Sequence, residues 1–502
     1  MTVFNKRKFF YFLGASVVLF WLVMVGLLIR KTQFQGNDQL PGIPAHAGNM
    51  DRSQHEWMEI YLKGKKVGFS EMRLSPLGQE LLIEEKMELA LNLMGQPSVM
   101  RMSTRAVLDK GYALKRFLMI IDSGVVRFRV SGKVDGDRIL VETGEGEKAR
   151  KHTISVDGPL TIGAGITGFF NGRKIKVGET FRFTMFDPSV LSHRDVAVKV
   201  ADKTVISLSG KEYSAFRLET KAWGQSLVFW LNEDGVLLKE EGFMGLTLVR
   251  SDKAHAPFDV DGSAGADLYD AAAVSVKRTL DRARDITYLK LNVAGLRDTG
   301  FDLTVLNENR QKLKGNVLEI TQEIIPRRVA WKKGSITETT PDLKAFLSPE
   351  INIQSDDGAL LKKVREIAGD EEDKRSVAQK LMAWVYENVE KRPVVSVPDA
   401  LTVLETKVGD CNEHAVLLTA LLRAAGIPAR ECVGIVYSDN RFFYHAWTEA
   451  WLGRWISMDA TLNQMPVDAT HIKLVHGGLD RQAGLMALMG KLKLEIVDYK
   501  HD

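Results

Sequence analysis

The pattern of apolar and polar positions changes character at about residue 250. Before it, apolar and polar residues alternate with period two, as in Met87–Leu93, and this alternation is typical of half-buried strands. Three Asp-Gly pairs lie between apolar runs, at 135–136, 157–158 and 234–235. Such pairs predict hairpin turns. We therefore expect an antiparallel β-rich domain over residues 53–251, built as a sandwich or an open barrel.

A less regular stretch follows the predicted β-rich domain. Residues 252–267 are rich in Gly and Pro and are expected to form a linker. The next segment, 268–339, is expected to be a small β-rich lead-in. It begins with a helix-compatible stretch at 268–284 and contains predicted strands at 286–293 and 317–321.

After residue 340 the apolar spacing becomes that of helices. Apolar residues three and four apart predict helices that begin near Asp356, Val377 and Asp399. A fourth helix begins at Cys411, with Asp410 as its N-cap, and ends before Gly426 and Pro428. Strands are expected next, at 430–437, 442–451 and 454–458. The pattern predicts an α+β domain over residues 340–480 and a C-terminal tail over 481–502.

The N-terminal segment predicts a membrane anchor. Residues 9–29 carry no charged side chain, and their length matches the roughly 20 residues that cross a bilayer as a helix. Basic residues precede the run, which favours residues 1–8 in the cytoplasm and the rest outside, after a tether over 30–52. We expect a single-pass protein of the cytoplasmic membrane whose larger part faces the periplasm; the alternative is a cleaved signal peptide.

Charge and cysteine content narrow the function classes. The 502 residues carry 68 basic and 64 acidic side chains, for a net charge of +4, with no basic stripe of the kind that binds nucleic acid. The two cysteines are Cys411 and Cys432. A disulfide between them would consume the thiol at the helix start, so both are expected as thiols, with Cys432 a buried strand residue.

Three residues on separate elements suggest nucleophilic catalysis. Cys411 opens a helix, where the positive end of the macrodipole is expected to lower the thiol pKa. His445 lies on a predicted strand, and Asp459 ends the next strand. A thiol, an imidazole and a carboxylate in these places can serve as nucleophile, base and orienter. The alternative is that Cys411 is one more small buried apolar residue.

Other roles near these residues stay open. His414, one turn after Cys411, is a rival base. The backbone N–H of Cys411 is one expected oxyanion donor, and Trp384 and Asn388 are weak guesses for the second.

The same residues are also candidates for a metal site. Cys411, His414, His445 and Asp459 are metal-ligand types, but they lack the paired close spacing of a structural zinc site. Asp468 and Asp480 show no calcium-loop spacing. No metal and no cofactor is expected.

Four motifs in order resemble one family. Gly409-Asp410-Cys411, the run from Gly426 to Arg430, His445-Ala446-Trp447 and Asp459 together resemble the transglutaminase-like superfamily, a papain-type fold of cysteine enzymes. The resemblance covers about residues 340–480. Segments 354–357 and 467–472 are similar to a membrane-associated bacterial branch of that superfamily. The resemblance implies acyl transfer by Cys411, His445 and Asp459.

The combined prediction is a membrane-anchored, transglutaminase-like cysteine enzyme acting on a peptide or amide bond of an envelope protein. Hydrolysis by a protease or amidase is favoured over crosslinking, because water is always present and nothing encodes an amine site. The alternative is a non-enzymatic envelope scaffold or assembly protein that binds partners through the β-rich domain. The sequence indicates neither a substrate-binding pocket nor an oligomeric state.

Overall fold

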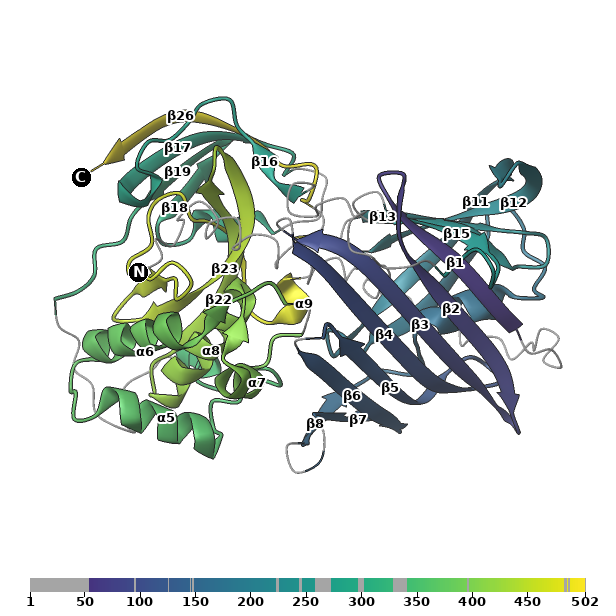
Figure 1. Ribbon diagram of the computed structural model, residues 1–502, viewed down its shortest axis with the longest axis horizontal. Coiled ribbons are helices and arrows are strands. Elements are labelled where there is room, and N and C mark those ends of the chain that lie inside the picture. Colours follow the sequence, from purple (N-terminus) through teal and green to yellow (C-terminus); the bar gives the residue numbers. More distant parts are fainter. Residues whose placement is uncertain are drawn as a thin grey trace. The chain divides into compact units, whose positions relative to one another are not determined.

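The computed structural model describes three stretches of the chain, 54–257, 272–327 and 341–501 (Figure 1). Short gaps within them lie at 94–95, 125, 145, 147–148, 223–224, 243–245, 297–301, 395–396, 483–484 and 486–487. The described residues form two compact units. The first holds residues 54–257, and the second holds nearly all of 272–501.

The first unit is one long antiparallel sheet. Its strands are β1 (Gln54–Leu62), β2 (Lys65–Leu77), β3 (Glu80–Leu93), β4 (Gln96–Asp109), β5 (Leu114–Asp122), β6 (Arg127–Asp135), β7 (Arg138–Thr143), β8 (Arg150–Ser155), β9 (Leu160–Thr161), β10 (Thr180–Asp187), β11 (Ser192–Leu208), β12 (Lys211–Ala222), β13 (Gln225–Leu231), β14 (Leu237–Glu241) and β15 (Leu246–Ser251). The 15 strands lie in the order β8-β7-β6-β5-β4-β3-β2-β1-β15-β14-β13-β12-β11-β10-β9, so the first strand pairs with the last. Only β9 and β10 among them pair in parallel.

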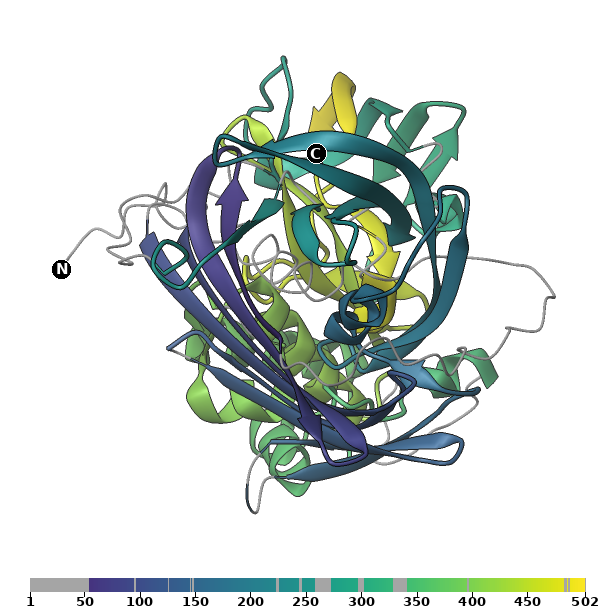
Figure 2. The same ribbon diagram turned by 90° about the vertical axis from the view of Figure 1, so that its right-hand side faces the viewer.

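A short helix, α2 (Gly163–Phe170), packs against the curved sheet seen end-on in Figure 2. Phe169 and Phe170 make edge-to-face contacts with Phe183 of β10, at centroid distances of 5.1 and 6.3 Å. On the other side, a Cβ on Gly165 would meet Leu108 of β4 at 3.1 Å. The helix therefore fills the space between two parts of the sheet that are distant in strand order.

Two of the three predicted Asp-Gly hairpins are confirmed and one is wrong. Gly136 connects β6 to β7 and Gly235 connects β13 to β14, each with a positive φ and antiparallel partners. The pair at 157–158 connects β8 to β9, which lie at opposite ends of the sheet. The chain leaves the sheet after β8, because α2 and β9 follow on the other side of the strand order. Local turn chemistry could not show this.

The second unit is an α+β fold. Its helices are α4 (Pro341–Ala345), α5 (Gly358–Ala368), α6 (Lys374–Asn388), α7 (Ala400–Thr406), α8 (Cys411–Ala424) and α9 (Leu479–Gln482), with 3-10 turns η3 (Ala283–Asp285) and η4 (Leu303–Asn307). Its strands are β16 (Val274–Ser275), β17 (Ile286–Ala294), β18 (Gln311–Lys314), β19 (Val317–Thr321), β20 (Glu390–Lys391), β21 (Val408–Gly409), β22 (Ala429–Ser438), β23 (Arg441–Trp451), β24 (Trp455–Met458), β25 (Ile472–His476) and β26 (Lys493–His501).

Two sheets organise this unit. One has the order β16-β23-β22-β25, with β24 also pairing with β23, and the other has the order β18-β19-β17-β26. The helices α5 to α8 group on one side of β22 and β23 in Figure 1. A buried cluster of aliphatic side chains joins these helices to β24, including Leu360, Leu381, Leu418 and Ile456. The helices and three strands predicted after residue 355 are confirmed, and each begins within three residues of its predicted start.

The segments that flank the predicted catalytic domain differ from expectation. The predicted helix at 268–284 is wrong over its described part, which holds β16 and η3 instead. The strands at 286–293 and 317–321 are confirmed as β17 and β19. Residues 493–501, expected within a tail, form β26 and pair with β17 over its whole length. The end of the chain thus completes the sheet that the lead-in segment begins.

The predicted N-terminal transmembrane helix is not supported, and the fold description is corrected on this point. Residues 9–29 lie outside the described part of the chain. None of the helices in the described part is long and apolar enough to cross a bilayer. The longest, α6, has 15 residues, against roughly 20 needed. The corrected description is a β-rich α+β chain.

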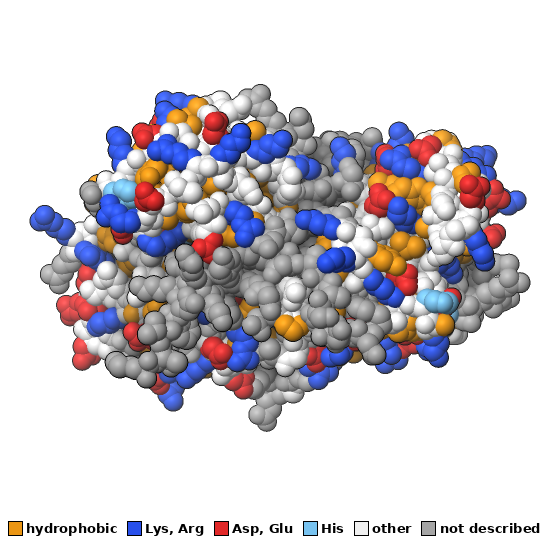
Figure 3. Space-filling view, turned by 45° about the horizontal axis from the view of Figure 1, so that its top comes forward, with side chains coloured by type: hydrophobic (Ala, Val, Ile, Leu, Met, Phe, Trp, Pro, Cys, Tyr) orange, Lys and Arg blue, Asp and Glu red, His pale blue; other side chains and the backbone are white. Residues whose placement is uncertain are grey.

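Charges of both signs mix on the surface. On the face shown in Figure 3, blue Lys and Arg side chains lie among red Asp and Glu side chains over the described residues. Elsewhere on the sheet, Lys and Arg side chains pair with carboxylates of neighbouring strands, as Arg101 with Glu88 and Arg105 with Glu84, both at 2.9 Å. Exposed pairs of this kind contribute little to stability, on the order of 0–1 kcal/mol each.

Candidate active site

The helix α8 is held rigidly at the end where Cys411 lies. Asp410 is its N-cap and forms a capping box with Glu413, whose carboxylate accepts from the Asp410 N–H at 3.0 Å. A Cβ on Gly409 would lie 2.2 Å from the Glu413 Cβ, so only glycine leaves room for that side chain. The capping box fixes where the helix starts, and therefore where the thiol of its first residue lies.

The rest of α8 is enclosed, because every residue from Cys411 to Arg423 is buried. Thr448 of β23 donates to the Ala415 carbonyl at 3.1 Å and contacts Thr419 Oγ1 at 3.2 Å. At the other end, Arg423 donates to the Ala429 carbonyl and to Glu350, at 2.8 Å each. Contacts at both ends and in the middle fix α8 on the strand that carries His445.

Cys411 meets β23 where that strand has a gap in its pairing. On the edge away from β22, residues 441–442 pair with β16 and residues 448–451 pair with β24. Between them, no described strand pairs with that edge. The Ala446 backbone N–H, inside this gap, donates a hydrogen bond to the Cys411 sulfur. The sulfur therefore lies beside the residue that follows His445.

His445 and Asp459 are in direct contact and fully buried. The Nε2 of His445 lies 2.7 Å from Asp459 Oδ2, and neither side chain is exposed to solvent. An ionised carboxylate only accepts, so Nε2 carries the proton and Nδ1 is left with a lone pair. This Nδ1 is buried and has no hydrogen-bond partner among the described residues. Burial lowers the pKa of His445, and Asp459 opposes that shift.

Asp459 is held as a carboxylate by donors on both of its oxygens. Its Oδ1 accepts the backbone N–H groups of Thr461 at 2.7 Å and Leu462 at 3.1 Å. Its Oδ2 accepts from His445 and, at 3.2 Å, from His471 Nε2. Although burial alone would raise the pKa of Asp459, His445 and His471 hold it well below its usual range. The carboxylate is thus a fixed negative charge behind the His445 ring.

The predicted lowering of the Cys411 pKa is wrong. Burial raises the pKa of the thiol well above its usual range, and the neighbouring Asp410 and Glu413 carboxylates raise it further. The Ala446 N–H opposes this shift. The helix terminus is outweighed because the capping box that forms it brings two carboxylates to the same place. Cys411 is therefore a thiol at rest, with the Asp410 and Glu413 carboxylates and the Ala446 N–H acting on it.

The rival base His414 points into the start of its own helix. Its Nδ1 lies 2.6 Å from the Asp410 carbonyl oxygen. Burial lowers its pKa to about 4. The His414 ring therefore helps to satisfy the backbone at the start of α8. Its lowered pKa makes it a weak proton acceptor.

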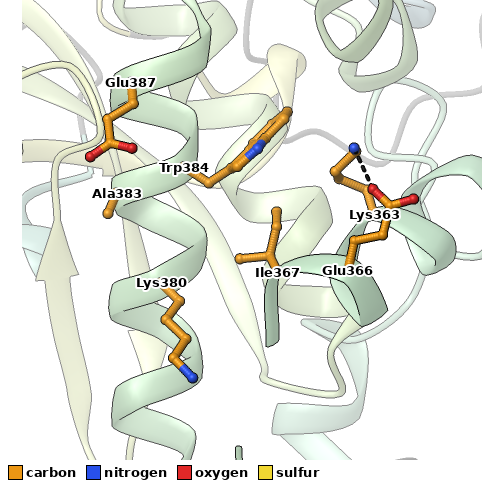
Figure 4. Close-up of a pocket in the computed structure, with 7 residues that line it drawn as sticks. All are labelled: Lys363, Glu366, Ile367, Lys380, Ala383, Trp384 and Glu387. Atoms are coloured by element: carbon orange, nitrogen blue, oxygen red, sulfur yellow. Dashed lines mark hydrogen bonds and ion pairs between the residues drawn. The ribbon is translucent and has the colours of Figure 1, made fainter. Parts of the chain in front are cut away.

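The two guesses for a second oxyanion donor are engaged elsewhere. Trp384 lines a shallow groove of about 410 Å³ on α5 and α6, next to Ile367 (Figure 4). The Lys363 ammonium lies 5.3 Å from the Trp384 ring centroid. The Asn388 amide donates to the Trp384 carbonyl at 2.9 Å. Neither side chain is available for a charge developing beside Cys411.

His471 is the site residue that sequence reasoning missed. It lies in the segment 467–472, which resembles the membrane-associated branch of the superfamily but has no periodicity that singles out a histidine. Besides its Asp459 contact, its ring packs at 88° against Trp447, at a centroid distance of 5.4 Å, and Trp447 also stacks on His445 at 6.2 Å. Trp447 therefore packs against both imidazoles that contact Asp459.

His445, Asp459 and His471 together form a set of donors of the kind that binds a metal ion. The ligand atoms of His445, Asp459 and His471 all lie within 4.8 Å of one another. Both histidine Nε2 atoms already face the same carboxylate oxygen at 2.7 and 3.2 Å. Hydrogen bonding accounts for these contacts without an ion.

The arginine of the Gly-Ile-Pro-Ala-Arg run has a structural role. Arg430 donates to Glu449 at 2.7 Å and to Glu308 at 2.9 Å. Lys473 reaches the same two carboxylates, at 2.8 Å from Glu449 and 3.2 Å from Glu308. This buried network joins β22, β23 and β25 to η4. The neighbouring Cys432 is a buried strand residue, as predicted, and neither Cys432 nor Cys411 forms a disulfide among the described residues.

Part of the chain matches a known family. Residues 362–460 match the family model of the transglutaminase-like superfamily. None of the curated proteins matches the chain. Three similar solved structures are a protein described as a putative cysteine protease from Cytophaga hutchinsonii (21% identity, 43% of this chain and 86% of that chain, TM-score 0.29), a β-barrel-like protein of a domain of unknown function from Brucella abortus (14%, 40% and 94%, 0.29) and the periplasmic domain of TgpA from Pseudomonas aeruginosa bound to ethylmercury (14%, 36% and 91%, 0.21).

The matched segment runs from α5 to the residue after Asp459, so it contains Cys411, His445 and Asp459. His471 and Lys473 lie beyond it. The chain therefore carries a transglutaminase-like domain at residues 362–460, the family that the four motifs indicated.

Proposed function

We propose that the chain is a cysteine enzyme that transfers an acyl group from a peptide or amide bond through a thioester on Cys411. The observation that carries the proposal is the buried Nδ1 of His445, which lacks a hydrogen-bond partner on a ring whose other nitrogen is bonded to Asp459. A buried nitrogen left unpaired costs free energy, on the order of 1–3 kcal/mol, and a thiol that donates to Nδ1 would remove that cost. The Nδ1 lone pair can accept a proton, and the nearest candidate donor is the Cys411 thiol, which lies beside Ala446, the residue after His445.

The chemistry follows from the states of the three groups. Nδ1 of His445 takes the thiol proton as sulfur attacks the carbonyl carbon, so an S–C bond forms and an imidazolium remains. Asp459 stabilises that imidazolium. The imidazolium then gives its proton to the amine as the C–N bond breaks. In the second half, water or an amine attacks the thioester, its proton goes to Nδ1, and the thiol is restored.

The raised pKa of Cys411 decides the timing of proton transfer. Because the thiol is protonated at rest, His445 acts as a general base during the attack rather than as the partner of a preformed thiolate. The Cys411 backbone N–H, at the first position of α8, is the oxyanion donor that this proposal assigns. We favour hydrolysis over transamidation, because water is always present as an acyl acceptor and needs no dedicated binding site.

The experiment is acylation by an activated ester, p-nitrophenyl acetate, on the full chain, followed by partition of the thioester between water and added cadaverine. We expect a burst of nitrophenol and an acetyl group on Cys411, and no burst from Cys411→Ala. Release of acetate that cadaverine does not divert supports a hydrolase; stoichiometric acetyl-cadaverine supports a transamidase. A wild-type burst that survives in Cys411→Ala refutes the proposal and leaves the scaffold alternative.

A further inference from the structure

The transglutaminase-like match ends at residue 460, yet the contacts around Asp459 continue beyond it. Asp459 Oδ2 accepts from two imidazoles, His445 inside the matched segment and His471 eleven residues after its end. Both rings are fully buried, with centroids 5.8 Å apart. The triad as usually counted uses one of these histidines, and the second has no assigned role.

His471 is itself held by charges that come from far along the chain. Its Nδ1 lies 3.4 Å from Asp468 Oδ1, and Asp468 Oδ2 accepts from Arg284 at 2.8 Å. Arg284 also donates to the Tyr437 carbonyl. Arg310 donates to the carbonyls of Val467 and Asp468. Two arginines of the lead-in segment therefore fix the loop that places His471 behind Asp459.

The packing around this loop leaves His471 little freedom. A Cβ on Gly434, which lies opposite His445 in the β22–β23 pairing, would be 1.9 Å from the Ile472 carbonyl oxygen. This close approach is open only to glycine and brings the residue after His471 against the strand next to His445. Trp447 closes the remaining side of the ring.

We propose that His471 is a positioning residue of this site: its Nε2–H fixes the Asp459 carboxylate behind His445, while Asp468 and Arg284 fix His471. The inference rests on the proposed function, because it assigns His471 a role in tuning the base. A carboxylate with one free lone pair could rotate or take up a proton, and either change would alter the His445 ring that depends on it. The second donor removes both freedoms.

The consequence for His445 has a definite sign. The charged and titratable groups that act on the His445 ring are Asp459, His471 and Arg284. Removing the His471 donor leaves more negative charge on Asp459 to stabilise the His445 imidazolium, so the His445 pKa rises. A neutral hydrogen-bond donor at position 471 should keep the His445 pKa close to its wild-type value. Gln suits this test, since its amide N–H₂ can reach where Nε2 lies.

The test is a pH titration of the histidine rings by NMR on the full chain labelled with ¹⁵N-histidine, with the His445 signals assigned from their loss in His445→Gln. We expect the His445 midpoint in His471→Ala to move up by about one pH unit or more, and that in His471→Gln to stay close to wild type. His476→Ala is the matched control. His476 lies five residues after His471, and its ring contacts Glu308, at 3.1 Å, rather than Asp459.

Two further outcomes separate this inference from the proposed function. A His445 midpoint in His471→Ala equal to that of the His476→Ala control overturns the positioning role, even if Cys411 still forms an acyl-enzyme. An acyl-enzyme that fails to form in the wild type refutes the proposed function, whatever the midpoints. Should His471→Ala not fold, His471→Leu carries the test, because leucine also lacks a donor but fills more of the space of the ring, and the same upward shift is expected.

Discussion

Glu431 gives a prediction whose size follows from the structure. Its side chain lies on β22, one residue before Cys432, and is buried next to Glu350, Arg423, Asn352 and Gln482. One of its oxygens has no hydrogen-bond partner among the described residues. Burial, and to a smaller extent the Glu350 carboxylate, raises the pKa of Glu431 from 4.5 to about 8. The folded protein therefore holds a proton there at neutral pH that the unfolded chain releases.

The sign and magnitude follow from linkage. Because the folded pKa lies above the unfolded value, the group's favourable contribution is complete below pH 4.5 and is lost as pH rises toward 8. At about 1.4 kcal/mol per pH unit, the loss is on the order of 3 kcal/mol at pH 7 and 5 kcal/mol above pH 8. Glu431→Gln removes the titrating proton. We expect it to match wild type near pH 4.5 and to be more stable at pH 8.

The assay is hydrogen exchange on peptides from β22 in the full chain, followed by mass spectrometry at several pH values. It reports the local free energy of opening without assuming that the two units unfold together. Glu387→Gln, an exposed glutamate on α6, is the control and should show no pH-dependent difference. Equal protection of β22 in Glu431→Gln and wild type from pH 5 to pH 8 would refute the reasoning.

Three further predictions concern the frame and the base. Glu449→Gln leaves Lys473 and Arg430 buried without their shared carboxylate, so β23 should lose about 3–5 kcal/mol of protection from hydrogen exchange at pH 7. Since Arg430 and Lys473 hold the pKa of Glu449 at about 2, its contribution is present above pH 4.5 and lost as pH falls toward 2; a difference from wild type that fails to narrow below pH 4 contradicts this. Gly409→Ala should break the capping box of α8 and cost about 1–2 kcal/mol in the same assay, while Gly358→Ala, with nothing within 4 Å of its Cβ, should be near neutral; equal effects would be evidence against the packing argument. The acid limb of Cys411 acylation should lie below pH 6.5, because burial lowers the His445 pKa and the base must be neutral to act; a limb above that pH is inconsistent with a buried base.

Sequence reasoning found the parts of the site that are encoded locally. The helix after Asp410 and the strands with His445 and Asp459 follow from apolar spacing over a few residues, so their bounds could be predicted. The order of cysteine, histidine and carboxylate along the chain then suggested the contact between His445 and Asp459, which the structure shows at 2.7 Å.

The features that sequence reasoning missed depend on contacts between segments that are distant along the chain. His471 lies in a loop with no periodicity, and the arginine behind Asp468 is 184 residues away along the chain. The thiol pKa was predicted in the wrong direction because the helix terminus was considered without the burial and the carboxylates that surround it. The Asp-Gly pair at 157–158 looked like a hairpin because a turn does not show which strand the chain joins next.

The most direct test of the central claim compares the two buried thiols of the catalytic unit. Burial raises the pKa of both Cys411 and Cys432, but it is the Cys411 sulfur that accepts a hydrogen bond from Ala446, the residue after His445. After brief exposure to p-nitrophenyl acetate, peptide mapping by mass spectrometry should place the acetyl group on Cys411 and not on Cys432. His445→Ala should slow that acetylation by roughly 10²–10⁴-fold. Equal acetylation of the two cysteines, or a rate at Cys411 that His445→Ala leaves unchanged, would contradict the account.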